Sequence, residues 1–208
     1  FGQQTPTIAY VSQEQIKSIG DTVELECAVQ HVKDYPVIWV KRDVEALFIT
    51  HNSKVVFPDQ RFTLRHDPGS NTYTLQIKDL QETDAGIYSC QIRMATKSSI
   101  SADVAVQIRL PPVISDNSTR SVIVSEGESV TLECYAYGYP IPKISWRREN
   151  NAILPTGGPI YKGNVLRLNN VKKEDRGTYY CVAENAVEPG ARRNVNLEVE
   201  FAPIPSTT

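Results

Sequence analysis

The sequence predicts an all-β protein built from two antiparallel β-sandwiches in tandem. Its 208 residues are enough for two domains of roughly 100 residues each. Apolar and polar residues alternate over short runs such as Val104, Val106 and Ile108, and turn residues recur roughly every 8 to 12 positions, as in sandwich folds. No stretch has a convincing helical period, so the alternation indicates strands along the whole chain.

An internal repeat divides the chain into two copies of one module. The first part of the module recurs at an offset of 107 positions (27 to 134) and the later part at 91 (90 to 181). The early set is Gly20, Val23, Leu25, Cys27 and Trp39, and the later set is Leu75, Ile77, Leu80, Asp84, Gly86, Tyr88 and Cys90. The first copy is therefore longer by 107 − 91 = 16 residues, which lie between its tryptophan and the later set.

The four cysteines are expected to form one disulfide in each copy. They are Cys27, Cys90, Cys134 and Cys181, and none belongs to a C-x-x-C motif of the zinc or thioredoxin type. Four cysteines allow three pairings, but each copy of the repeat holds one pair, which predicts Cys27–Cys90 and Cys134–Cys181. Such bonds persist in an oxidising compartment, so the sequence predicts an extracellular protein.

A glycosylation sequon agrees with this location. Asn117-Ser118-Thr119 fits the acceptor pattern for N-linked glycans, which are attached on the secretory route. We therefore predict a glycan on Asn117. The chain lacks a signal peptide at Phe1, so we expect a processed or trimmed ectodomain.

The charge balance argues against nucleic acid and against anionic membranes as partners. The formal net charge is −2 and the pI is about 6.0, whereas such partners require a basic surplus. The basic doublets Arg147-Arg148, Lys172-Lys173 and Arg192-Arg193 are scattered, which favours solvated strand or turn positions over a phosphate track. No apolar run is long enough to span a bilayer, so we expect contact with the membrane only through a lipid anchor outside this chain.

The residues give no sign of catalysis. The three histidines, His31, His51 and His66, have no H-E-x-x-H spacing, and the chain contains no nucleophile elbow, P-loop or dinucleotide fingerprint. Acidic residues such as Asp84 and Asp175 fit turn positions that cap backbone amides, and no calcium-loop motif occurs. We expect no enzyme, no cofactor and no metal.

At this point the two copies resemble the immunoglobulin fold. Each has a cysteine, a tryptophan twelve residues later and then the pattern Asp-x-Gly-x-Tyr-x-Cys, at 84–90 and 175–181. The resemblance implies that the tryptophan packs on the disulfide and that the tyrosine forms a corner at the E–F turn. The longer first module, 1–110, resembles the variable type with extra C′ and C″ strands, and the shorter second module, 111–202, resembles the intermediate type (I/C2). It also implies an ion pair between Arg61 and Asp84, without a counterpart at Asp175.

The junction between the modules has little slack. Proline stands at 111 and 112 and favours extended backbone, so we expect a stiff, extended rod. The Pro-Val of this junction recurs 91 positions later as Pro203-Ile204, which indicates that 203–208 begin a linker to a third module. The second module, including Trp146 to Pro155 and Val171 to Cys181, resembles the IgLON-like cell-surface proteins. That family implies three immunoglobulin modules, a lipid anchor (GPI) at the outer face of the plasma membrane, and roles at cell junctions and between neurons.

The resemblance implies adhesion or recognition through the outer face of the first module's G, F, C and C′ strands. Strand alternation counted outward from Trp39 and Cys90, which point inward, and the family pattern on C′ select the residues of this face. They are Ile38, Val40, Phe48, His51, Gln91 and Arg93. An apolar stripe on a solvent-facing sheet marks an interface; the alternative is that these residues are tolerated surface hydrophobes or are covered by loops.

Two questions about the partner stay open at this stage. The protein binds either itself, as a homodimer, or another immunoglobulin-superfamily protein, and the apolar stripe permits both. The alternative function is a receptor-type module for a carbohydrate or a secreted protein. Carbohydrate readers more often expose tryptophan, and both tryptophans here are assigned to the disulfides, so adhesion is favoured.

Overall fold

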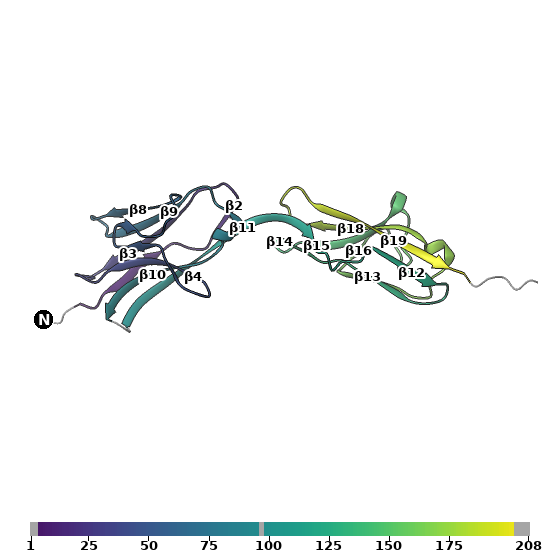
Figure 1. Ribbon diagram of the computed structural model, residues 1–208, viewed down its shortest axis with the longest axis horizontal. Coiled ribbons are helices and arrows are strands. Elements are labelled where there is room, and N and C mark those ends of the chain that lie inside the picture. Colours follow the sequence, from purple (N-terminus) through teal and green to yellow (C-terminus); the bar gives the residue numbers. More distant parts are fainter. Residues whose placement is uncertain (1–3, 96–97, 202–208) are drawn as a thin grey trace, which may run out of the picture. The chain divides into compact units, whose positions relative to one another are not determined.

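The structure is a computed structural model that describes residues 4–95 and 98–201. The chain divides into two compact units, Phe1–Arg109 and Leu110–Thr208. Within the described ranges every regular element is a β-strand or a short 3-10 helix (Figure 1). The predicted all-β class with two sandwiches is therefore confirmed. Residues 203–208, where the sequence predicts the start of a linker, lie outside the described residues.

The first unit is a sandwich of two sheets. Its elements are β1 (Thr7–Val11), β2 (Gln15–Ser18), β3 (Val23–Gln30), β4 (Val37–Arg42), β5 (Leu47–Phe48), β6 (Thr50–His51), β7 (Lys54–Val55), β8 (Phe62–Asp67), β9 (Thr72–Ile77), η1 (Glu82–Asp84), β10 (Gly86–Ala95) and the first part of β11 (Ser98–Ile114). One sheet has the order β1-β3-β9-β8, and in the other β11, β10, β4 and β5 are neighbours, with β2 parallel to β11. The stretch that is 16 residues longer in this copy, between Trp39 and the later set, holds β5, the small β6–β7 hairpin and β8.

The second unit has fewer strands than the first. Its elements are the end of β11, β12 (Ser121–Ser125), β13 (Val130–Glu133), β14 (Ala136–Tyr139), β15 (Lys143–Arg148), η2 (Glu149–Asn151), β16 (Tyr161–Lys162), β17 (Val165–Leu168), η3 (Lys173–Asp175), β18 (Gly177–Glu184) and β19 (Ala191–Glu200). The larger sheet has the order β12-β19-β18-β15-β16, and β13 pairs with β17 in a separate two-stranded sheet.

Each core is built around a tryptophan and a disulfide. Cys27–Cys90 and Cys134–Cys181 join the strand pairs that the repeat assigns, and each has Cα atoms 6.4 Å apart. Trp39 and Trp146 are fully buried. The Trp39 indole donates a hydrogen bond to the Tyr73 carbonyl at 3.3 Å. The buried Trp146 indole nitrogen, in contrast, has no hydrogen-bond partner among the described residues.

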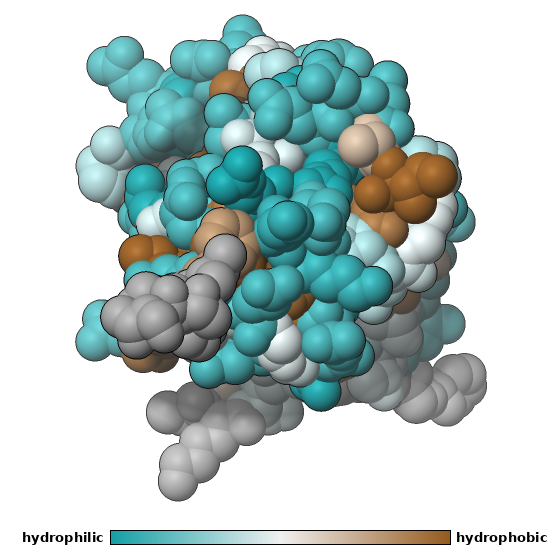
Figure 2. Space-filling view, turned by 90° about the vertical axis from the view of Figure 1, so that its right-hand side faces the viewer, coloured by the Kyte–Doolittle hydropathy of each residue, from teal (hydrophilic) through white to brown (hydrophobic). Residues whose placement is uncertain are grey.

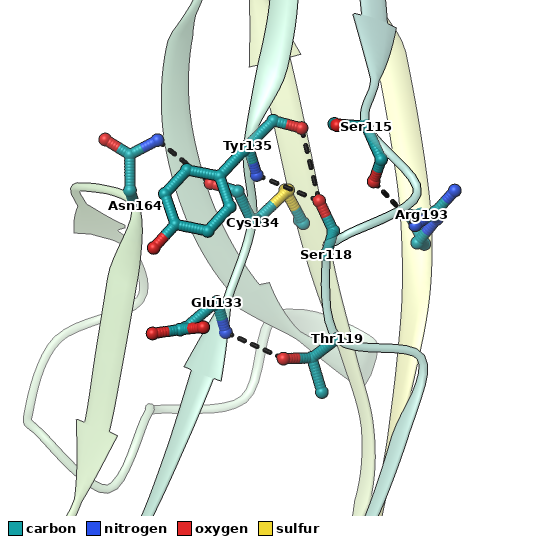
Figure 3. Close-up of a disulfide and its surroundings, with 9 residues drawn as sticks. Ser115, Ser118, Thr119, Glu133, Cys134, Tyr135, Asn164 and Arg193 are labelled. Atoms are coloured by element: carbon teal, nitrogen blue, oxygen red, sulfur yellow. Dashed lines mark hydrogen bonds between the residues drawn. A yellow bond between two sulfur atoms is a disulfide. The ribbon is translucent and has the colours of Figure 1, made fainter.

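Figure 3 shows how the segment that carries the sequon, between β11 and β12, is held beside the second disulfide. The Ser118 hydroxyl donates to the Tyr135 carbonyl at 3.2 Å and accepts from the Tyr135 amide at 2.9 Å. The Thr119 hydroxyl accepts from the Glu133 amide at 2.9 Å. Ser118 is buried while Asn117 is exposed, so the acceptor side chain stands clear of this network.

Both units contain the tyrosine corner. The Tyr88 hydroxyl donates to the Asp84 carbonyl at 2.7 Å, and the Tyr179 hydroxyl donates to the Asp175 carbonyl at 2.6 Å. Gly86 and the equivalent glycine in the second unit have φ angles of +147° and +133°, a region that side chains with a Cβ rarely adopt. The Asp-x-Gly-x-Tyr-x-Cys pattern is thus a requirement of this turn.

Burial of the corner tyrosine predicts a loss of stability at high pH. Burial raises the pKa of Tyr179 to about 12, against a usual value near 10 in an unfolded chain. Below pH 10 both states are protonated; between about 10 and 12 only the unfolded state ionises, so the second domain loses stability in that window. Calorimetry should show Tyr179→Phe to be less stable at pH 8, by about 1 kcal/mol for the lost hydrogen bond, but less sensitive to alkali. Equal losses between pH 9 and 11.5 in parent and variant would contradict this.

The ion pair implied for the first unit forms a two-pronged contact. Arg61 donates to the two carboxylate oxygens of Asp84 at 2.6 and 3.0 Å and to Asp59 at 3.0 Å. Hydrogen bonds to Asp84 are the main cause of the raised pKa of Arg61. In the second unit Arg148 instead donates to the carbonyls of Glu174 and Arg176, so a different arginine closes the same turn.

Candidate protein-binding face

The predicted binding residues all come from β4, β5, β6 and β10 of the first unit. Cross-strand pairing sets Gln91 opposite Ile38, Ser89 opposite Val40, and Val40 opposite Phe48. The predicted C, C′, F and G strands are thus β4, β5, β10 and β11, in one sheet; Figure 1 labels β4, β10 and β11. We call the outer surface of these strands, with the β6–β7 hairpin at its side, the outer face.

Two residues expected to be solvent-exposed at its centre are buried. Ile38 is 4% exposed and Val40 is 1% exposed, so the expectation that they face solvent in the monomer is wrong. Strand alternation gives the direction of a side chain but not what covers it. Here Phe48 is a cross-strand neighbour of Val40, Gln91 is a cross-strand neighbour of Ile38, and Ile38 lines a hollow together with Phe48 and Arg93.

Phe48 and Arg93 form the exposed layer above these two residues. Phe48 is 50% exposed, and the Arg93 guanidinium carbon lies 5.2 Å from the centre of its ring. Arg93 also donates to the Gln91 side-chain oxygen at 3.0 Å, and Gln91 donates to the Ser89 hydroxyl at 3.4 Å. The arginine stacks on the aromatic ring and is tethered to its own strand, which holds both groups in place.

A hollow of about 360 Å³ opens beside Phe48. Its lining residues come from four strands and from the segments that flank β4 and β7: Pro36, Ile38, Phe48, Thr50, His51, Val56 and Arg93. No acidic residue lines it, and the wall is largely apolar. His51 is part of this lining and is exposed.

Hydrogen bonds from backbone amides of β4 to side chains of the hairpin attach this side of the hollow to the sheet. The Thr50 hydroxyl accepts from the Trp39 amide at 2.9 Å, and the Asn52 side-chain oxygen accepts from the Val37 amide at 3.0 Å. Ile49, which directly precedes the hairpin, is buried, whereas Leu47 on the edge strand β5 is 37% exposed. The hollow therefore has a wall that is anchored to the core.

Two further exposed apolar residues were missed by the sequence reasoning. Val56 is 55% exposed and lines the hollow, and Ile87 is 43% exposed on β10. Ile87 could have been found, because the alternation from Cys90 that selects Gln91 and Arg93 also selects it in the other direction. Val56 follows β7 in a segment without strand alternation, so the sequence carries no comparable signal for it.

Exposed hydrophobic residues also occur elsewhere on the chain, so exposure alone does not mark a site. In the view of Figure 2 the surface is mostly hydrophilic, with hydrophobic residues in a few separate groups. Scattered apolar residues of this kind are normal on soluble proteins. The outer face differs because an aromatic ring, a stacked arginine and an apolar hollow adjoin one another.

Other kinds of site find no support in the described part of the chain. Among those residues no group of three or more histidine, cysteine, aspartate or glutamate side chains could hold a metal ion. None of the helices there is long and apolar enough to cross a membrane.

Comparison with known proteins identifies both units. The family model of the immunoglobulin V-set domain matches residues 10–109, and that of the immunoglobulin domain matches 111–185. Lachesin of Schistocerca americana is 63% identical over 208 aligned residues, which cover 98% of this chain and 60% of that protein. Lachesin of Drosophila melanogaster is 60% identical, with 98% and 57% covered. This chain thus spans about three fifths of the length of these relatives.

A solved structure matches both units together. It is a chain in the crystal structure of Dpr11 IG1 bound to DIP-gamma IG+IG2, with a TM-score of 0.78, 28% identity, and coverage of 94% of this chain and 99% of that one. The two family matches, the two disulfides and the lachesin similarity agree with the resemblance that the motifs indicated. The chain belongs to the immunoglobulin superfamily, as a V-set domain followed by a second immunoglobulin domain, and is similar to insect lachesin over nearly all of its residues.

Proposed function

We propose that the outer face of the first domain binds another immunoglobulin domain, and that the protein acts in recognition or adhesion at the cell surface. The observation that carries this proposal is the half-exposed Phe48, stacked under Arg93 at the mouth of an apolar hollow. Aromatic residues and arginine are the types most enriched at the energetic centres of protein interfaces.

The burial of Ile38 and Val40 changes how this face would bind. These two residues stabilise the sheet within the monomer and form the floor of the face. The groups available to a partner are Phe48, Val56 and the hollow between them, with Arg93 and His51 at the edge. A partner would seat an apolar side chain in the hollow and cover the ring of Phe48, which removes apolar surface from water.

The comparisons support this class of function. The solved structure with a TM-score of 0.78 is one in which IG domains of two proteins are bound to each other. The similarity to the lachesins covers 98% of this chain. The partner is an immunoglobulin domain of a second copy or of a related protein. Self-association needs a patch that is self-complementary under two-fold symmetry, and this face offers both a projecting ring and a hollow.

The test is a charge placed on the exposed ring. Phe48→Asp is expected to weaken association of the two-domain chain, measured by sedimentation over a micromolar range, by at least about tenfold, the scale of an interface hot spot. The melting temperature should stay within a few degrees, because Phe48 is half exposed in the monomer. Thr63→Asp is the matched control, since Thr63 is an exposed strand residue of β8 in the other sheet.

Two outcomes would overturn the proposal. If Phe48→Asp stays folded and associates like the parent, the outer face is not the interface. If the parent remains monomeric and binds no immunoglobulin protein, but does bind a carbohydrate or a secreted protein, the receptor-type alternative replaces adhesion.

The proposed location is the extracellular side of the plasma membrane. The two disulfides and the exposed Asn117 support an extracellular site, and the family resemblance supports a lipid anchor outside this chain. Release of the whole protein from cells by a phosphatidylinositol-specific phospholipase tests the anchor. A mass shift on treatment with an N-glycosidase tests the glycan, and an unmodified Asn117 in secreted protein would exclude it.

A further inference from the structure

The second domain carries a cationic surface that the proposed adhesion face does not involve. Two of the basic doublets, which are separate in the sequence, contribute arginines to it. Arg147 lies on β15 and Arg192 on β19, with β18 between them. A hollow of about 240 Å³ is lined by both arginines together with Arg148, Asn150, Asn151, Tyr180 and Val182.

Arg192 is held in a defined position by an aromatic ring. Its guanidinium carbon lies 3.9 Å from the centre of the Tyr180 ring, and Tyr180 is the cross-strand partner of Arg147. A guanidinium stacked on a ring keeps its N–H groups free at the edge, where they can donate to an anion in a fixed fork. The sheet thus aligns Arg147, Tyr180 and Arg192 across three neighbouring strands.

The cationic surface continues along the same sheet. A second hollow of about 580 Å³ is lined by Arg147 again, and also by Lys143 and Lys162. Lys143 and Arg147 are four residues apart on β15, which corresponds to ~13 Å along a strand, and Arg147 and Arg192 are two strands apart, or ~10 Å. The cations are therefore spread over the sheet instead of converging on one point.

These cations lack ion-pair partners within the structure. None of Lys143, Arg147, Lys162 or Arg192 forms an ion pair with any residue of 4–95 or 98–201. All four are exposed. Glu184, opposite Lys143 on β18, is the carboxylate among the residues that line the two hollows. Arg148 differs, because its guanidinium is occupied by the carbonyls of Glu174 and Arg176.

We propose that this surface, formed by Lys143, Arg147, Lys162 and Arg192, binds a sulfated polysaccharide chain. Charge complementarity favours a polyanion as the ligand. Because the cations are spread along the sheet, their spacing favours a linear chain with repeated charges and disfavours a single phosphate group. Arginine forks match the oxygens of tetrahedral anions and of carboxylates. The disulfides place the domain outside the cell, where sulfated polysaccharides are the polyanions that carry such charges.

The experiment uses immobilised heparin as the probe and the two-domain chain as the protein. The parent should bind at physiological salt and weaken steeply as salt rises, because exposed charges are screened. Arg147→Glu with Arg192→Glu should lower the affinity at least tenfold while the melting curve is unchanged. The matched control is Arg167→Glu with Lys173→Glu, which makes the same charge change at exposed positions of the same domain outside the two hollows and should keep most of the affinity.

Three results would overturn the proposal: a parent that does not bind heparin at physiological salt, equal losses in the two double variants, or equal competition by non-sulfated hyaluronan, anionic vesicles or DNA. Equal losses in the two double variants, or equal competition by these other polyanions, would mean that heparin is attracted by charge alone. The Phe48→Asp variant should bind heparin like the parent, and Arg147→Glu with Arg192→Glu should associate like the parent. The two sites can thus fail independently.

Discussion

Removing the Cys27–Cys90 bond by a double change to alanine is expected to lower the stability of the first domain by about 4 kcal/mol. The bond joins residues 63 positions apart, and a cross-link that closes so long a loop removes much of the entropy of the unfolded chain. A small domain is stable by only about 5–15 kcal/mol. The variant should therefore unfold far more easily and be secreted in low yield.

Calorimetry of the two-domain chain measures this effect and supplies its own control. For a domain of about 100 residues, a loss of 4 kcal/mol lowers the melting temperature by roughly 16–30 °C. The transition of the second domain should not move, because its bond, Cys134–Cys181, is separate. The reciprocal variant, without Cys134 and Cys181, should shift only the second transition. Equal shifts of both transitions in either variant would show that the disulfides do not act within single domains.

The features that the sequence predicted best are those that local spacing determines. The corner tyrosine must reach a carbonyl four residues earlier, and the glycine two residues before it must adopt a positive φ. The short pattern Asp-x-Gly-x-Tyr-x-Cys contains the residues that meet both requirements. Because the pattern occurs once in each copy, it also predicts which cysteines form disulfides. The 16-residue difference between the copies falls in a stretch that holds more strands in the first unit, β5 to β8, than in the second, which has β16 there.

The features that the sequence predicted poorly depend on the size of neighbours on other strands. Alternation assigns Ile38 and Val40 to the outer side of β4, but it does not predict their burial beside long side chains such as Phe48 on the next strand. The same reason explains why Arg147 and Arg192 seemed scattered. They are 45 positions apart in the sequence (147 to 192), and only the pairing of β15, β18 and β19 brings them to one hollow.

The burial of Ile38 leads to the second large expected effect, on folding instead of binding. Ile38→Asp should lower the stability of the first domain by at least about 3 kcal/mol. It removes a buried aliphatic side chain, which alone costs about 2–5 kcal/mol, and it places a carboxylate where water is excluded. Ile38→Val, which removes a single methylene, should cost only about 0.5–1.5 kcal/mol. Phe48→Asp should lower the stability least, because Phe48, on the strand next to Val40, is half exposed.

Comparison of Ile38→Asp with Ile38→Asn separates the charge from the lost packing. Both replacements have nearly the same shape, so both lose the same apolar contacts. A buried carboxyl has its pKa raised above the unfolded value near 4, and the aspartate variant therefore loses stability as the pH rises above that value. The two variants should have similar first-domain melting temperatures near pH 4, and the aspartate variant should melt well below the asparagine variant at pH 7. If instead Ile38→Asp melts like the parent at pH 7, the residue faces water, the cover by Phe48 and Arg93 does not exist in solution, and Ile38 returns to the centre of the binding face as a contact residue.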